Sequence, residues 1–171
     1  PATHIPKTFL TASLAFSLTG TSLVADPPGN GWALAWADEF SGTAVDTSKW
    51  SVGTGARRDA TNTASAVSVA GGILSVKTYT EGGKHYTGWL GSNGKFENAF
   101  GYWEARMRFN SSAGMWSAFW LQPSGINNVG DPAGNGTEID IVEHRRQDSG
   151  GADMRNKSAM NIHWDGYGAS H

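Results

Sequence analysis

Three carboxylates lie within six residues of one strand-like run of this 171-residue chain: Glu138, Asp140 and Glu143. The residues between them are isoleucine and valine, which favour buried β-strands. Three crowded acids repel one another, and partial burial raises the free-energy cost of ionising them. Such surroundings can keep one carboxylate ionised and another protonated near neutral pH, as acid–base and nucleophilic chemistry on paired carboxylates requires.

Strand geometry determines which of these acids can act together. Side chains alternate between the faces of a strand, so Glu138 and Asp140 share one face and strict alternation would put Glu143 on the other. A β-bulge at residues 141–142 would reset the phase and return Glu143 to the acid face. The Cα atoms of Glu138 and Glu143 would then be about 13 Å apart. Leaning side chains could close most of this gap, and a carboxyl separation of about 5–5.5 Å would suit a retaining glycosidase. The alternative is an edge strand with solvated acids.

The N-terminal region predicts an exported protein. Residues 1–25 have a weakly basic start, an apolar run with Ser and Thr, and small residues at the end, which is typical of a secretory signal peptide. A buried N-terminal strand or helix is the alternative. Residues 26–31 (DPPGNG) predict a flexible linker, and residues 32–171 a folded, glycosidase-like domain. We therefore expect a secreted protein, extracellular or periplasmic.

The chain begins without Met and stops at His171, after a turn-like stretch (WDGYG) with no closing strand. We expect it to be a fragment of a longer gene whose domain is truncated at the C-terminus. All-β sandwiches commonly need about 200–250 residues. Residues 26–171 alone are therefore expected to be poorly soluble and inactive, because sheet edges and apolar faces would stay uncovered.

Composition narrows the class of protein. The chain has no cysteine, so it has neither disulfides nor a thiolate metal site. A net charge of −2 argues against a nucleic-acid partner. Charged residues make up only 16%, whereas there are 23 glycines and 8 tryptophans, which suits a β-sandwich with an aromatic, sugar-stacking cleft. Most of the tryptophans are expected to fill the core. We expect a monomer, with no membrane association once the signal peptide is removed.

No segment has sustained helical periodicity, and short strand-like runs bounded by turns predominate. The clearest is 102–109 (YWEARMRF), whose alternation of apolar and polar residues predicts a half-buried antiparallel strand. The candidate strands are residues 32–40, 66–69, 73–79, 86–92, 101–110, 115–122, 137–143 and 158–164. Together they predict one all-β domain of two stacked antiparallel sheets.

Four segments of the chain, in sequence order, are similar to the motifs of one known family. They are residues 36–42 (WADEFSG, followed by Asp46 and Trp50), 94–96 (GKF) with 101–106 (GYWEAR), 114–121 (GMWSAFWL) and 138–143 (EIDIVE). The last pattern alone would be a weak signal, whereas four ordered segments make the likeness specific. By these motifs the chain resembles glycoside hydrolase family 16.

The resemblance implies a concanavalin-like β-jelly roll and retaining endo-hydrolysis of a β-linked polysaccharide, with no required cofactor. By position, Glu138 is then the nucleophile, Asp140 its electrostatic partner and Glu143 the acid/base. The chemistry agrees, because the nucleophile must be ionised to attack the anomeric carbon and the acid must be protonated to donate to the leaving oxygen. Asp140 lies between them and can influence which acid carries the proton.

The spacing of the acids also bears on the substrate. Two residues between Asp140 and Glu143 resemble the laminarinase-type (endo-1,3-β-glucanase) branch rather than the lichenases, which have one. Agarase- and carrageenase-like members share the wider spacing. The aromatic run 116–120 favours 1,3-β-glucan, although Ser117 stands where the laminarinase-like pattern often has Pro.

The exit from the acidic strand is unusually charged. It reads His144, Arg145 and Arg146. These residues either meet an anionic, sulfated sugar or form a solvated loop.

Further residues are candidates for binding rather than chemistry. Trp116 and Trp120 share a strand face and either stack on sugar or pack in the core. Arg106 either hydrogen-bonds sugar hydroxyls or forms a cross-strand ion pair. His163 either orients a carboxylate or a sugar, or is structural. A structural Ca²⁺ is a further expectation, without an assigned ligand set, from the loop acids Asp131, Asp148, Asp153 and Asp165.

Two other functions share these features. A carbohydrate-binding protein on the same fold would have no reason to crowd three carboxylates. A transglycosylase would use the same acids but transfer the sugar chain to another sugar rather than to water. The leading interpretation is a secreted hydrolase of a laminarin-type glucan, with a galactan as the alternative substrate.

Overall fold

A computed structural model of the protein describes residues 27–167. The predicted signal peptide, residues 1–25, lies outside them. Backbone contacts divide the chain into two units, Pro1–Trp32 and Ala33–His171. In the first unit, residues 27–32 form neither helix nor strand, and Nε1 of Trp32 donates a hydrogen bond to the carbonyl oxygen of Pro28 at 3.0 Å. Within the described part of the chain, no helix has the length and apolar character needed to cross a membrane.

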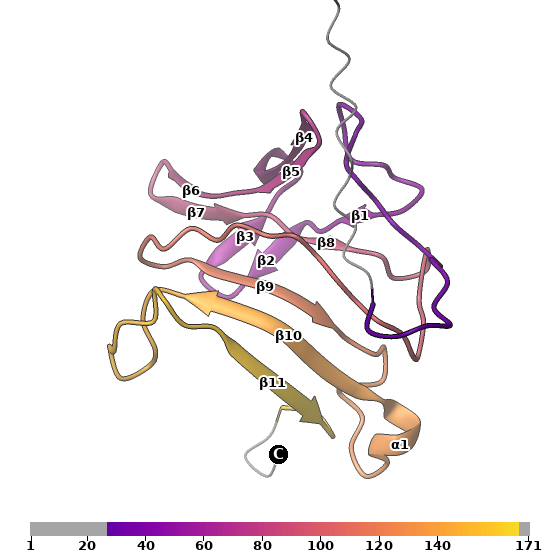
Figure 1. Cartoon of the computed structure of the whole chain (residues 1–171). Coiled ribbons are helices and arrows are strands. Elements are labelled where there is room, and N and C mark those ends of the chain that lie inside the picture. The colour runs from indigo at the N-terminus through magenta and orange to yellow at the C-terminus, as the bar shows by residue number, and fades with distance from the viewer. Residues whose placement is uncertain (1–26, 168–171) are drawn as a thin grey trace, which may run out of the picture. The chain divides into compact units, whose positions relative to one another are not determined.

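The second unit consists almost entirely of short strands, so the prediction of an all-β domain is confirmed. Its elements in chain order are β1 (Ser51–Val52), β2 (Gly55–Arg57), β3 (Ala60–Asn62), the 3-10 helix η1 (Ala64–Ala66), β4 (Val67–Ala70), β5 (Ile73–Val76), β6 (Thr78–Glu81), β7 (Lys84–Thr87), β8 (Leu90–Gly91), β9 (Trp116–Leu121), α1 (Pro132–Asn135), β10 (Thr137–Arg145) and β11 (Ala159–Trp164) (Figure 1).

Glycine pairs close two of the hairpins. Gly71 and Gly72 join β4 to β5, and Gly82 and Gly83 join β6 to β7. All four residues have positive φ, between 56° and 76°. Two-residue hairpin turns of this kind need positive φ at both central positions, and glycine adopts it at no steric cost.

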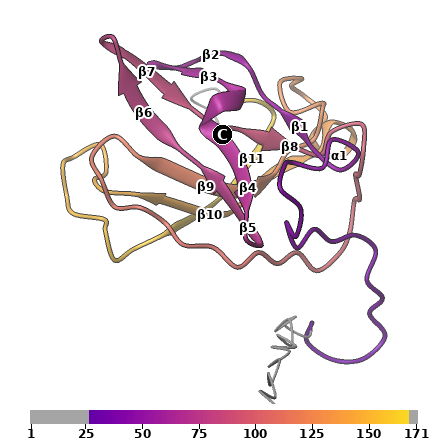
Figure 2. The same cartoon turned by 90° about the horizontal axis from the view of Figure 1, so that it is seen from above.

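The strands form four hydrogen-bonded sheets. The three longest strands form the antiparallel sheet β11–β10–β9 and lie side by side in Figure 1, and Figure 2 shows β9 and β10 beside each other from above. A second sheet has the order β2–β3–β7–β6, and the pairs β1–β8 and β4–β5 complete the set. The β3–β7 pair is parallel, so the expectation of purely antiparallel sheets is wrong here. A parallel pair needs a long crossover, and η1 with strands β4 to β6 supplies it.

Two predicted strands are not formed. Residues 101–110 and 32–40 adopt no regular structure, and the alternating pattern of 102–109 is therefore misleading. Tyr102 and Met107 belong to opposite faces of that pattern, yet both are more than two-fifths exposed. No strand within residues 27–167 pairs with this segment. Alternation reports which face would be buried, but a strand also needs a hydrogen-bonding neighbour.

The N-terminal motif instead builds an aromatic cluster. Trp36 stacks on Phe96 with ring centroids 5.5 Å apart and meets the edge of Trp50 at 4.9 Å. Asp38 accepts a hydrogen bond from Nε1 of Trp50 at 2.8 Å and from the backbone N–H of Phe40 at 2.9 Å. These residues therefore have a structural role, because their rings pack on one another and their polar atoms hydrogen-bond to one another.

Candidate active site

Strand β10 lies between β9 and β11 and carries the three acids (Figure 1). The register of β10 to both neighbours shifts after Asp140 and before Glu143. Ile141 has no Cα partner in either ladder, which makes it the extra residue of a β-bulge. The predicted bulge is therefore present. It sets Glu143 opposite Ala118 and Asp140 opposite Trp120, and these partners share one face of β9.

Two of the three acids are buried. Glu138 is 6% exposed and Asp140 is 5% exposed, whereas Glu143 is partly exposed. Burial raises the pKa of Asp140, the charges of Glu143 and Glu138 raise it further, and His163 opposes the rise. Asp140 therefore keeps its proton to a higher pH than an ordinary aspartate does.

Glu138 is held by two donors from outside its own strand. Nε2 of Gln122 donates to Oε2 of Glu138 at 2.5 Å, and the hydroxyl of Tyr167 donates to the same oxygen. Gln122 also donates to the Tyr167 hydroxyl at 2.6 Å. Burial and the bond to Glu138 raise the pKa of Tyr167 to about 12, so this phenol stays a donor across the physiological range. The carboxylate is thus fixed from two directions, while its other oxygen has no part in these bonds.

Glu143 is held by one donor on each oxygen. Nε1 of Trp116, on β9, donates to Oε1 at 2.6 Å. Nδ2 of Asn161, on β11, donates to Oε2 at 2.6 Å. Because the donors come from the strands on either side of β10, the carboxyl group is oriented by the sheet itself.

His163 lies beside the central acid. Its Nε2 is 3.3 Å from Oδ2 of Asp140, and its backbone pairs with Glu138 across β10 and β11. Glu138, Asp140 and His163 form the only group of three or more potential metal ligands among residues 27–167. One ligand atom of each lies within 4.8 Å of the others. Of the two roles predicted for His163, contact with a carboxylate is therefore the one that the geometry favours.

The two predicted tryptophans have different surroundings. Trp116 is 47% exposed and bonds to Glu143. Trp120 is less exposed and stacks against Trp89, with ring centroids 6.4 Å apart. Trp89 in turn lies 5.8 Å below the guanidinium of Arg57. Trp116 therefore offers the more accessible ring beside the acids, and Trp120 is mainly packed.

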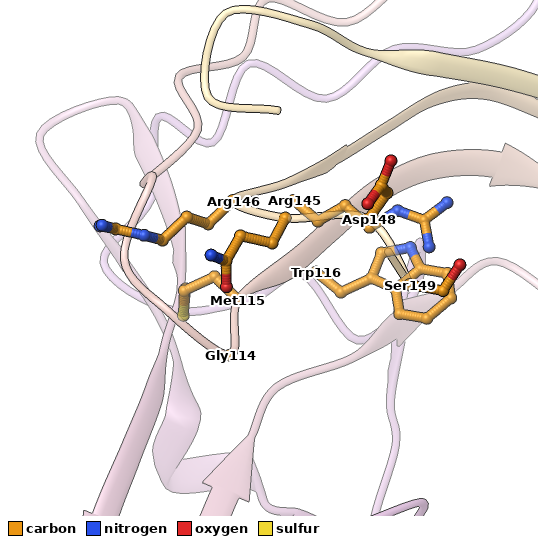
Figure 3. Close-up of a pocket in the computed structure, with 8 residues that line it drawn as sticks. Gly114, Met115, Trp116, Arg145, Arg146, Asp148 and Ser149 are labelled. Atoms are coloured by element: carbon orange, nitrogen blue, oxygen red, sulfur yellow. The ribbon is translucent and has the colours of Figure 1, made fainter. Parts of the chain in front are cut away.

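Arginines surround Trp116. The guanidinium carbon of Arg145 is 4.4 Å from the centroid of the Trp116 ring, and that of Arg58 is 4.9 Å from the same centroid. Arg145 is the last residue of β10, and Arg58 occupies the turn between β2 and β3. Figure 3 shows Arg145 beside Trp116 and Arg146 directed away from both.

A family model described as "Glycosyl hydrolases family 16" matches residues 43–171, three quarters of the chain. The match includes the whole acidic strand and its two neighbours. The chain belongs to glycosyl hydrolase family 16. The predicted family resemblance is confirmed.

Relatives within the family differ in the activities that their names state. The chain is 28% identical over 145 residues to "Glucan endo-1,3-beta-glucosidase A1" of Niallia circulans, covering 70% of this chain and 21% of that protein. It is 34% identical over 147 residues to "Beta-porphyranase E" of Zobellia galactanivorans, covering 80% of this chain and 51% of that protein. This family-16 chain therefore spans at most about half the length of these two relatives.

A solved structure establishes the fold. The crystal structure of laminarinase from Flavobacterium sp. UMI-01 matches with a TM-score of 0.63 and 26% identity, over 77% of this chain and 57% of the laminarinase chain. The family-16 fold is a concanavalin-like jelly roll, and the chain covers part of it. The predicted fold class is confirmed.

One predicted site residue, Arg106, does not contact the three acids. Arg106 is exposed in the irregular segment 101–110. No hydrogen bond or ion pair within the described part of the chain joins Arg106 to Glu138, Asp140 or Glu143. The segment lacks the strand structure that would have aimed this side chain.

The exit of β10 is not simply a solvated loop. His144 is buried, stacks on Phe109 at 5.2 Å and has Nε2 3.0 Å from the carbonyl oxygen of Arg155. Strand β10 continues through Arg145, which turns alternate residues to opposite faces. The three charged residues therefore do not act as one patch.

The four loop aspartates do not gather into a metal site. All four accept backbone hydrogen bonds: Asp131 from Gly134, Asp148 from Gly150 and Ala152, Asp153 from Arg155, and Asp165 from Gly130. Asp153 also pairs with the guanidinium of Arg155 at 2.6 Å. Each carboxylate is engaged by donors of the protein, and the structural Ca²⁺ stays a prediction.

Sequence reasoning missed four residues around the acids. Gln122 continues the alternation of Trp116 and Trp120, and Asn161 is in phase with His163, so both carried a usable signal. Tyr167 lies in an irregular stretch after β11, and Arg58 lies in a two-residue turn. No local pattern in this family-16 sequence places either of them near β10.

Proposed function

We propose that this protein is a retaining endo-glycoside hydrolase that cleaves a β-linked polysaccharide by double displacement. The observation that carries the proposal is the bulge at Ile141, which gathers Glu138, Asp140 and Glu143 on one face of the sheet. Membership of glycosyl hydrolase family 16 supports a polysaccharide substrate. Residues 1–25 resemble a signal peptide, so we propose that the protein acts outside the cytoplasm.

In the first step, Glu138 attacks the anomeric carbon. Gln122 and Tyr167 both donate to Oε2 of Glu138, which leaves Oε1 as the attacking atom. The bond from the anomeric carbon to the leaving oxygen breaks with its electron pair going to oxygen. Glu143 donates its proton to that oxygen, and a glycosyl ester forms on Glu138.

In the second step, water hydrolyses the glycosyl ester on Glu138. Glu143, now a carboxylate, takes a proton from water as the water oxygen attacks the anomeric carbon, and Glu138 leaves as a carboxylate. Trp116 and Asn161 hold both oxygens of Glu143, so the same group is in place for both proton transfers. The raised pKa of Asp140 lets this residue share a proton with the neighbouring carboxylates as charge moves between them.

We propose 1,3-β-glucan as one substrate class. The matches to a glucan endo-1,3-β-glucosidase and to a laminarinase structure support it. The match to a β-porphyranase and the arginines beside Trp116 favour a second candidate, an anionic galactan.

Product analysis tests the proposal. The full-length protein would be incubated with laminarin, lichenan, agarose and carrageenan, and the products would be separated by size while the first-formed anomer is followed by proton NMR. Short oligosaccharides that first appear as the β-anomer are expected. The α-anomer would contradict the double displacement. Binding without products would favour a carbohydrate-binding protein, and longer chains would favour a transglycosylase.

A further inference from the structure

We infer that Arg58, Trp116 and Arg145 form a binding site for an anionic substituent, a sulfate ester or a carboxylate, on the sugar that lies beside Glu143. The inference rests on the proposed function, because it assigns the substituent to a polysaccharide held at the same acids. It divides the charged exit of β10 into one arginine that belongs to the site and one that does not.

The two arginines reach the same ring from distant parts of the chain. Arg145 follows Glu143 by two residues, so both lie on the acid face of β10, about 6.6 Å apart along the strand. Arg58 comes from the turn between β2 and β3, where its φ is +52°. A non-glycine residue in this left-handed region is under backbone strain. The strained turn nevertheless brings the Arg58 guanidinium to 4.9 Å from the Trp116 centroid.

The charges of these arginines are not compensated by an ion pair. In residues 27–167, the structure gives neither Arg58 nor Arg145 a carboxylate partner within salt-bridge distance. Two guanidinium groups close to one indole repel each other, and the ring only partly offsets this through cation–π attraction. An anion placed between or beside them would lower the electrostatic free energy of the site.

The carboxylates nearby are already engaged. Glu143 accepts hydrogen bonds from Trp116 and Asn161. Oδ1 of Asp148 accepts hydrogen bonds from the backbone N–H groups of Gly150 and Ala152, both at 2.9 Å. Their hydrogen bonds are thus directed to other partners, and neither carboxylate forms an ion pair with Arg58 or Arg145 within the described part of the chain.

There is room for a ligand group beside two of the three residues, Trp116 and Arg145. A hollow of about 420 Å³ is lined by Trp116 and Arg145 together with the segments before β9 and after β10 (Figure 3). A guanidinium presents a planar fork of N–H donors that fits two oxygens of a sulfate or a carboxylate at once. Because Trp116 also donates to Glu143, the substituent would sit on a sugar next to the bond that is cleaved.

Arg146 provides a matched control. It has the same charge and lines the same hollow, but its side chain points away from Trp116 (Figure 3). Arg58→Gln and Arg145→Gln remove one charge from the proposed site, whereas Arg146→Gln removes one charge beside it. Arg145→Lys keeps the charge and removes the fork, which separates general attraction from bidentate binding.

The experiment compares one polymer with and without its anionic groups. Retention of the full-length protein and of each variant would be measured in affinity gels containing a sulfated galactan, the same galactan after desulfation, or a β-linked mannuronan. kcat/KM would be measured on each polymer that is cleaved. We expect Arg58→Gln and Arg145→Gln each to lower the ratio of sulfated to desulfated binding by about 10- to 100-fold, and Arg146→Gln to leave it within about 2-fold.

The outcomes separate this inference from the proposed function. Retention in the sulfated gel alone identifies a sulfate ester, and retention in the mannuronan gel alone identifies a carboxylate. Retention that depends on Arg58 and Arg145 without cleavage of any polymer supports the anion site and contradicts the hydrolase. Cleavage of neutral laminarin with no preference for any anionic polymer overturns the anion site and supports the hydrolase. Equal losses in all three glutamine variants would also overturn it.

Discussion

The two faces of the β9–β10–β11 sheet hold their side chains in different ways. On the acid face, two carboxylates are almost fully buried. On the opposite face, Met160 is 79% exposed and Ile162 is 60% exposed, with Ile139 and Trp164 also exposed. This reverses the usual distribution, in which apolar side chains are covered and acids are solvated.

The difference shows what specifies each face. The acid face is fixed by directional bonds between neighbouring strands, because both Glu138 and Glu143 accept hydrogen bonds from two residues. The apolar face relies on burial, which has no direction and needs a covering surface. The site geometry is therefore set by hydrogen bonds from the strands on either side of β10 and from the residues that follow them, Gln122 after β9 and Tyr167 after β11.

The largest effect should follow from removing the nucleophile. Glu138→Gln should lower kcat on the preferred polysaccharide by about 10³-fold or more, because an amide cannot form the glycosyl ester. Binding should change by less than about 10-fold. Glu81→Gln, at the exposed β6–β7 turn, is the control and should keep full activity. Appreciable residual activity in Glu138→Gln would contradict the assignment of Glu138.

Two tryptophans on opposite faces give the sharpest test of the comparison. Trp116→Phe keeps an aromatic ring but removes the N–H that orients Glu143, so kcat should fall by about 10- to 100-fold. Trp164→Phe, on the apolar face, should change kcat by less than about 2-fold. Steady-state kinetics on one substrate measures both. Equal losses would mean that the faces are coupled and that Trp116 has no special role.

A smaller effect is expected at Tyr167. Tyr167→Phe removes one of the two donors to Glu138 but leaves Gln122 in place, so kcat should fall by about 10-fold. Tyr79→Phe removes a hydroxyl that contacts Ser65 at 2.9 Å, away from the acids, and should leave kcat unchanged. If both variants lose the same activity, Tyr167 acts through stability rather than through Glu138.

The smallest effect is a pH-dependent change in stability at Asp140. The pKa of Asp140 is raised above 3.8 in the folded protein. As pH rises above 3.8, the unfolded chain loses this proton before the folded protein does, so the free energy of unfolding falls until the folded pKa is passed. Asp140→Asn removes that loss, and the variant should gain a few degrees in Tm relative to the parent protein between pH 4 and pH 7.

Asp153→Asn is the control of opposite sign. Its hydrogen bonds and ion pair with Arg155 lower the pKa of Asp153 to about 2. Stability from this group is present above pH 3.8 and is lost as pH falls through about 2. Asp153→Asn should therefore be slightly less stable than the parent at pH 7, with the difference shrinking in acid. Thermal melts from pH 2 to 7 measure both variants, and the same sign in both would contradict the burial of Asp140.

Much of the site could be predicted because its signals are local. The spacing of Glu138, Asp140 and Glu143 required a bulge, and the structure has it at Ile141. Alternation along β9 also allowed Trp116 to share the face of the acids. The family motifs were sufficient for the fold class.

The other features of the fold and the site depend on contacts between distant segments, which no local sequence pattern indicates. The segment 102–109 has a strand-like sequence, yet no strand in the described part of the chain pairs with it. Arg58 and Arg145 are 87 positions apart in the sequence, and both approach the ring of Trp116 only because the β2–β3 turn reaches it. Such placements are set by tertiary structure, which periodicity does not encode.

The bulge at Ile141 divides β10 into two halves, each with its own phase. Removing the extra residue Ile141 would leave one residue between Asp140 and Glu143, and strict alternation would then keep Glu143 and Arg145 on the acid face without a bulge. Flattening the bulge while every residue is kept would instead turn each later side chain of the strand to the opposite side of the sheet. The acid/base and the neighbouring arginine therefore keep or lose the acid face together, through one backbone irregularity.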